Sequence, residues 1–152
     1  MTNNNQQTIP LSKNEQIWPI ECDIVSNEIK TGIWTTTQKQ LQGFDLNPEA
    51  HTDRLALLQL HLDERTDYRF NLSSLQPKLF VVLDNLEDEI NVVALTASQS
   101  VAGQYMDGDY LVLSNDMPLP VQAWMEAFIG RHGELLEQRR KKRKGAGRAS
   151  GN

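Results

Sequence analysis

The stretch Leu79-Phe80-Val81-Val82-Leu83 decides the fold that we predict from the sequence. It is an unbroken run of aliphatic and aromatic residues, and turn-forming residues at 73–77 and acidic residues at 84–89 bound it. A strand that is apolar on both faces is buried on both faces, which is the position of a central strand. We therefore predict a sheet that is built around residues 79–83.

The segments beside this strand show the period of half-buried strands. Apolar and polar residues alternate over 58–62 and again over 68–72, with a turn expected at 63–65 between them. Residues 90–95 supply a further strand. Four successive strands with short connections predict an antiparallel meander.

The outer parts of the chain add two more strands and a short helix. Residues 17–25 and 33–37 are rich in β-forming side chains, whereas 38–52 contain Gly43 and Pro48 and are expected to form a loop. After Thr96 the pattern becomes helical, with Ser98 as the expected N-cap. Residues 110–113 then return to a strand.

A longer helix is expected near the C-terminus, capped by Asn115 or Asp116 and with prolines in its first turn. Its apolar residues recur with helical spacing at Val121, Trp124, Met125, Phe128 and Ile129. We expect this stripe to cover the open face of the sheet. A groove for a cofactor or a partner is the alternative interpretation.

Together these elements predict an α+β fold: a curled antiparallel sheet of about six or seven strands with the C-terminal amphipathic helix packed on it. Closure of the sheet into a barrel is left open. The chain has 152 residues, which is enough for one core. We predict a polar, disordered N-terminus at 1–8, a single globular domain at 9–138 and a basic, disordered tail at 139–152.

Charge is strongly segregated along the chain, although the formal net charge is only -5. Of 15 basic residues, seven lie in 139–152, which has no acidic residue; 8 basic and 20 acidic residues remain elsewhere, a balance of -12. A body this acidic repels nucleic acid and anionic membranes. Any nucleic-acid contact would therefore depend on the tail, through Arg139, Arg140, Lys141, Lys142, Arg143 and Lys144.

The sequence offers no recognisable catalytic or metal-binding set, so we predict that the protein is not an enzyme and has no cofactor. His51, His61 and His132 lack neighbours at the spacing of a metal site, and His132 is expected to lie near a helix end. The carboxylates at 63–64 and 87–89 are expected to be solvated turn residues. Cys22 is the one cysteine and is expected to be a small, buried or half-buried hydrophobic residue, not a reactive thiol.

Several short motifs appear in an order that resembles a known family. They are Leu60-His61-Leu62-Asp63-Glu64, Tyr68-Arg69-Phe70-Asn71-Leu72-Ser73-Ser74, Pro77 with Phe80-Val81-Val82-Leu83, Thr96-Ala97-Ser98, Tyr105, Met117-Pro118, Trp124 with Phe128, Arg131-His132 and the terminal basic cluster. Together they resemble the proteobacterial domain-of-unknown-function family thirty-three-oh-five. The resemblance covers most of the chain, and it is clearest from Leu55 to Lys144.

The resemblance implies an accessory role, because members of that family are often encoded near molybdenum-dependent formate dehydrogenases and their assembly chaperones. It supplies no catalytic residues. We expect an interaction protein that acts in formate dehydrogenase maturation or regulation, with a dehydrogenase subunit or an assembly factor as partner. The expected contact residues are those of the basic run 139–144 together with Trp124, Phe128 and His132.

Two other functions remain open at this level: a nucleic-acid-associated regulator that uses the tail, and a small-molecule-binding domain. The first residues lack the charged start and apolar core of a secretory signal, so a cytoplasmic location is expected. No apolar run approaches the roughly 20 residues that span a bilayer, so no membrane span is expected.

Overall fold

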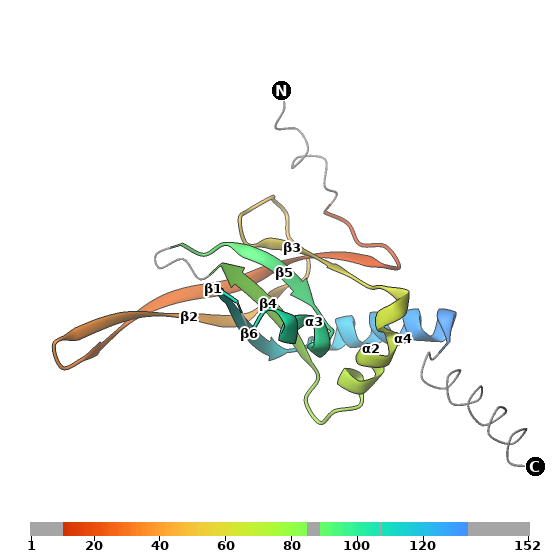
Figure 1. Cartoon of the computed structure of the whole chain (residues 1–152). Helices are drawn as coiled ribbons and strands as arrows, with labels where there is room; N and C mark the ends of the chain where they lie inside the picture. Colours follow the sequence, from red (N-terminus) through yellow and green to blue (C-terminus); the bar gives the residue numbers. More distant parts are fainter. Residues whose placement is uncertain (1–10, 85–88, 107, 134–152) are drawn as a thin grey trace, which may run out of the picture.

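The computed structural model describes residues 11–84, 89–106 and 108–133 (Figure 1). The predicted boundaries at residues 8 and 138 lie outside these ranges. Strands and helices follow in the order β1 (Ile17–Thr31), β2 (Trp34–Asp45), β3 (Leu55–Gln59), the 3-10 helix η1 (Leu62–Glu64), α2 (Arg65–Leu72), β4 (Lys78–Asp84), β5 (Val92–Thr96), α3 (Gln99–Gln104), β6 (Tyr110–Asp116) and α4 (Leu119–His132). The predicted α+β class is therefore confirmed.

The six described strands form two antiparallel sheets of three strands each. Their orders are β2-β1-β3 and β5-β4-β6. β4 is the middle strand of its sheet, and Leu79, Val81, Val82 and Leu83 are completely buried. The prediction that 79–83 form a central strand is confirmed.

The two sheets lie edge to edge without joining into one. β3 runs beside β5, and β2 runs beside β6, where Asn115 Nδ2 donates a hydrogen bond to the Leu41 carbonyl at 2.8 Å. Within the described residues no strand ladder crosses from one sheet to the other. The expectation of a single curled sheet is wrong, because each sheet has its own central strand flanked by its own two edges. Whether the sheet closes was left open by the sequence, and the six described strands do not form a closed barrel.

The predicted meander is also wrong, because the segment between β3 and β4 is a helix. Residues 68–72 alternate in polarity, but Tyr68 and Leu72 are also four residues apart and so share one face of α2. Tyr68 is buried, whereas Phe70 is 69% exposed on the opposite side. β3 ends at Gln59, so Leu62 belongs to η1 and not to the predicted strand over 58–62.

β1 and β2 are much longer than predicted. The expected loop over 38–52 is wrong in its first part, because β2 continues to Asp45. Gly43 lies at a β-bulge where the register passes from the Asp23/Gly43 pair to the Ile24/Leu41 pair, so the extra residue is on β2. The glycine therefore marks an irregularity within the strand and not its end.

The sequence predicted the N-cap of α3 correctly and that of α4 incorrectly. Ser98 is the N-cap of α3, and its Oγ accepts a hydrogen bond from the Val101 amide at 3.1 Å, as expected. Neither Asn115 nor Asp116 caps α4, because both belong to β6 and Pro118 occupies the N-cap. Backbone turns bonded to the Pro118 carbonyl start the helix instead.

The core contains the predicted helix stripe and the single cysteine. Val121, Met125, Phe128 and Ile129 of α4 are buried in the same cluster as β1 and β4 side chains, so the stripe does pack into the core. Cys22 is fully buried, as predicted, and this burial raises the pKa of its thiol to about 12. No helix in the described part of the chain is long and apolar enough to cross a membrane.

Candidate protein-binding surface

The distal half of the β1–β2 hairpin projects from the rest of the molecule as a two-stranded arm, which we define as residues 26–38 (Figure 1). All residues of the arm are exposed in both strands. Six residues of β-strand, from 26 to 31, span roughly 20 Å at about 3.3 Å per residue. The arm is thus long enough to reach into a cleft of another macromolecule.

The sequence at the tip explains why the chain reverses there. Thr31 and Trp34 are paired, which leaves Gly32 and Ile33 as a two-residue turn. Gly32 has a positive φ of 65°, and no other residue of the turn does, which is the pattern of a type II′ hairpin. The β-branched run Thr35-Thr36-Thr37 then favours continuation as a strand.

The base of the arm is held against both sheets. Ile24 and Leu41 face each other in the core, and the Leu41 carbonyl accepts the bond from Asn115. Lys39 is largely buried, and its Nζ donates to the Glu89 carbonyl at 2.6 Å. These contacts fix the direction in which the arm leaves the body.

The two faces of the arm differ in chemistry. Paired residues in a sheet project to the same face, so Ile29, Thr36, Thr31 and Trp34 share the face turned away from the Ile24–Leu41 side. Ile29 and Trp34 are 39% and 71% exposed, and Ile33 at the turn is 91% exposed. The arm therefore carries apolar side chains on one face and at its tip, and these three residues form what we call the tip patch.

The other face of the arm is polar and charged. Ser26, Glu28 and Lys30 of β1 lie on it, opposite Lys39, Thr37 and Thr35 of β2. A solvated two-stranded ribbon has no core of its own, because only one strand supports the other. A large exposed aromatic side chain on such a ribbon is the kind of feature that marks a contact surface.

The contact residues predicted on α4 lie mostly inside the molecule. The Trp124 ring is half-buried against Trp18, with 5.3 Å between ring centroids, and its Nε1 donates to the Asn14 carbonyl at 2.7 Å. Phe128 is completely buried and meets Tyr68 edge-on at 6.3 Å. In this conformation neither ring is arranged as part of an open groove.

His132 does lie in the last turn of α4, as expected, and is exposed. Its ring stands 4.8 Å from that of Phe128. Arg65 of α2 donates to the carbonyls of His132 and Gly133, the latter at 2.8 Å, and so satisfies the end of the helix. The surroundings of His132 thus serve to fix α2 against α4. The predicted basic contacts at 139–144 lie outside the described residues.

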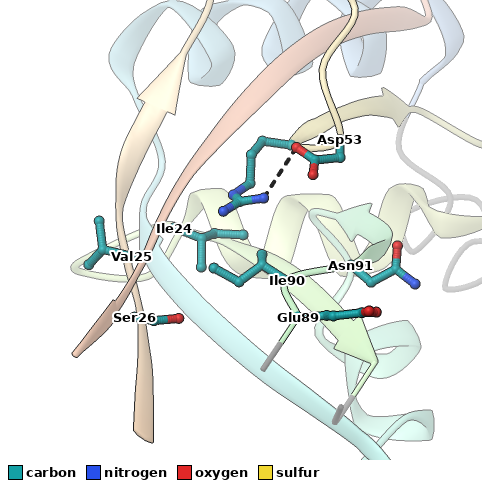
Figure 2. Close-up of a pocket in the computed structure, with 8 residues that line it drawn as sticks. Ile24, Val25, Ser26, Asp53, Glu89, Ile90 and Asn91 are labelled. Carbon is teal, nitrogen blue, oxygen red and sulfur yellow. Dashed lines mark hydrogen bonds and ion pairs between the residues drawn. The ribbon is translucent and has the colours of Figure 1, made fainter. Parts of the chain in front are cut away.

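A depression of about 730 Å³ lies beside the base of the arm (Figure 2). Ile24 and Ile90 lie close together at its centre, and Ser26, Glu89 and Asn91 lie at its margin. The guanidinium group of Arg54 also lines the depression, and its Nη1 lies 3.2 Å from Asp53 Oδ1. The depression is open to solvent, and its polar groups do not converge on one point as they do in ligand sites.

We also searched the described residues for a metal site and for a reactive side chain. No group of three His, Cys, Asp or Glu side chains there is placed to hold a metal ion. Burial raises the pKa of the Tyr68 hydroxyl, which donates to Glu64 Oε1 at 2.7 Å and accepts the His61 amide at 2.9 Å. That hydroxyl is therefore a structural link between η1 and α2.

Sequence reasoning missed the arm for an identifiable reason. The run from 26 to 38 contains many polar residues and no regular alternation of apolar ones, because neither face of the arm is buried. The signal that was present is Thr-Gly-Ile-Trp at 31–34, a glycine-led two-residue turn between β-branched or aromatic residues.

The chain matches a known protein family. A family model described as "Protein of unknown function (DUF3305)" matches residues 24–143, a range that includes the whole arm, both sheets in large part and α4. Neither a curated protein nor a solved structure matches the chain.

Proposed function

Because the chain belongs to this family of proteins of unknown function, we propose from its geometry that it is a non-enzymatic accessory protein that binds another protein through the β1–β2 arm. The observation that carries the proposal is the exposure of Ile33 and Trp34 at the end of a projecting ribbon whose base is fixed. The proposal agrees with the interaction role expected from the sequence and moves its main contact surface from α4 to the arm.

The energetics favour a protein contact at the tip patch. Full burial of one large apolar side chain is worth about 1.5–3 kcal/mol, and tryptophan is enriched among the residues that dominate protein interfaces. The Lys39 and Asn115 contacts at the base hold the arm in one direction. Binding therefore costs less ordering entropy than it would for a loose loop.

The acidic character of the body argues for a protein over a polyanionic surface. Outside 139–152 the chain has a formal balance of 8 basic and 20 acidic residues. Such a surface repels phosphates, so an anionic membrane or nucleic acid is a poor partner for the arm. An apolar cleft of a protein, neutral or basic at its rim, suits both the tip patch and the body.

The partner that we propose is a formate dehydrogenase subunit or an assembly factor for that enzyme, in the cytoplasm. This part of the proposal is supported by the expectation, implied by the resemblance described above, that members of the family are encoded near such genes. It is separable from the arm itself, because the arm can bind a protein whether or not that protein belongs to the dehydrogenase system.

The experiment is a pull-down from the native host with the full chain and three variants. Ile33→Ser/Trp34→Ser removes the two most exposed residues of the tip patch and should leave the fold intact. Phe70→Ser is the matched control, since Phe70 is 69% exposed on α2, and α2 lies at a distance from the arm (Figure 1). A chain ending at Gln138 measures the contribution of the basic tail.

We expect the wild type and Phe70→Ser to recover the same dehydrogenase subunit or assembly factor, and the arm variant to lose it. Retention of the partner by the arm variant would refute the role of the arm. Recovery of an unrelated protein through the arm, with formate oxidation unchanged after deletion of the gene, would refute the dehydrogenase assignment alone.

A further inference from the structure

Along the arm, no other described residue pairs with the outer edge of β1. β3 pairs with β1 only from Ile17 to Glu21, and the Cys22 amide then donates to the Arg54 carbonyl at 2.9 Å. Beyond that bond, no described strand lies on this side of β1, although β1 continues for nine more residues, to Thr31. The arm therefore presents a long free edge.

The groups that face outward along this edge follow from the alternation of an antiparallel strand. Because Cys22 points its amide toward the β3 side, Ile24, Ser26, Glu28 and Lys30 point their amides and carbonyls the same way. The residues between them point their amides and carbonyls toward β2. The hydrogen bond from Thr36 Oγ1 on β2 to the Ile29 carbonyl, at 3.5 Å, is consistent with this orientation. The bulge does not disturb the alternation, because its extra residue is on β2.

Free edges are usually protected in monomeric proteins by charged side chains, especially lysine, and by prolines, bulges or a covering element. The edge of β1 between residues 24 and 31 has no proline, and its register with β2 is regular from Ile24 to the turn. Its charges also alternate in sign, with Glu28 and Lys30 two residues apart on the same face. That order allows the edge to complement itself.

We propose that the outer edge of β1 pairs with the same edge of a second copy of this chain, antiparallel and centred on Ile29. A two-fold axis at Ile29 places Glu28 opposite Lys30 of the partner subunit, and Lys30 opposite Glu28 of the partner subunit. These residues have outward-facing backbone groups, so each pair exchanges two backbone hydrogen bonds. Ile29 lies opposite Ile29 of the partner subunit, in the non-hydrogen-bonded pair between the two Glu28–Lys30 pairs, where side chains approach more closely.

Other two-fold registers fit less well. Centring the axis on Glu28 or on Lys30 places identical charges directly opposite each other, which is destabilising. Centring it on Asn27 places Glu28 opposite Ser26 and Lys30 opposite Ile24 of the partner subunit, so neither charge is matched. Of these registers, the one centred on Ile29 is the only one that places each charge opposite an opposite charge. It also brings together two partly exposed apolar side chains, Ile29 of each copy.

The resulting interface is small, since it involves about six residues from each copy, and it belongs to the weak end of specific protein contacts. Its consequence is functional as well as structural. Pairing would create a four-stranded ribbon in which Ile29 and Trp34 of both copies lie on one face. A partner protein would then meet a doubled apolar strip.

The test is sedimentation equilibrium of the purified full chain over a wide concentration range, with charge variants at two exposed positions. Lys30→Glu and Glu28→Lys each place like charges opposite one another, and each should raise the dimer Kd about tenfold. The double variant Glu28→Lys/Lys30→Glu restores opposite charges and should return to the wild-type Kd. Circular dichroism confirms that each variant folds.

The two single variants control for net charge. Glu28→Lys makes the acidic chain less negative, so a general charge effect would strengthen association, whereas the proposed register requires weakening. A chain that stays monomeric at every concentration would overturn the proposal, and so would a dimer that ignores the charge swaps. The pull-down on Ile33→Ser/Trp34→Ser is independent of this result, because it uses the tip and not the edge.

Discussion

Replacement of Asn71 by alanine should remove much of the stability of this fold, because one side chain joins three elements. Asn71 lies in the last turn of α2 and is 8% exposed. Its Nδ2 donates to the carbonyls of Lys78 and Ala97 at 2.8 and 2.9 Å, and its Oδ1 accepts the Lys78 amide at 3.0 Å. The amide group thus connects α2 to the start of β4 and to the end of β5.

The magnitude follows from these three hydrogen bonds. Each contributes about 1 kcal/mol net, and truncation leaves their buried backbone partners unsatisfied, so Asn71→Ala should lower the free energy of unfolding by about 3 kcal/mol. Asn91→Ala is the matched control, because Asn91 is exposed and its side chain makes one hydrogen bond within the described residues, from Nδ2 to Asp84 Oδ2 at 2.6 Å. We expect that control to stay within about 0.5 kcal/mol of wild type.

The assay is urea unfolding followed by tryptophan fluorescence, in which a stability loss lowers the midpoint without changing the slope. A midpoint for Asn71→Ala that coincides with that of Asn91→Ala would refute the reasoning. It would mean that α2 is not joined to the second sheet in the way the structure indicates.

Three further predictions concern the caps, the turn and the thiol. Ser98→Ala removes the bond from the Val101 amide and the 2.5 Å bond to Asp67 Oδ2, and should cost about 1–2 kcal/mol in urea unfolding. Gly32→Ala places a side chain at positive φ and should cost about 1 kcal/mol, seen as faster amide exchange in the arm and not as a lower global midpoint. Because the pKa of Cys22 is raised from 9.0 to about 12, the unfolded chain ionises first, so stability should fall as pH rises through this range. The folded protein should also resist alkylation at pH 8, whereas urea should expose the thiol; rapid labelling without urea would contradict the buried position of Cys22.

The sequence was informative wherever burial left a clear pattern. The run at 79–83 is apolar on both faces because β4 is covered on both, and the stripe from Val121 to Ile129 has the spacing of a helix that buries one side. Ser98 could be identified as a cap because its side chain has one local role, to accept the Val101 amide. These features depend on short-range geometry that the residue order alone determines.

The predictions were wrong where a segment fits both the period of a strand and that of a helix, or where its side chains are not buried. The positions of Tyr68 and Leu72 fit both the alternation of a strand and the four-residue repeat of a helix. The helix is favoured by the hydrogen bonds that Asn71 makes to the Lys78 and Ala97 carbonyls, which lie outside α2. The division into two sheets depends on which edges meet, which no local pattern encodes. The arm was missed because its residues are exposed on both faces, so hydrophobic periodicity, the main signal for strands, does not apply to it.

Site-specific photo-crosslinking in the native host shows directly whether the tip of the arm contacts a protein. Benzoylphenylalanine is placed at position 34 and, in a separate strain, at position 70, which is similarly exposed on α2. We expect a discrete crosslinked protein from position 34 that is absent from position 70. Crosslinks from position 70 alone, or none from position 34 while the chain is folded and expressed, would contradict it.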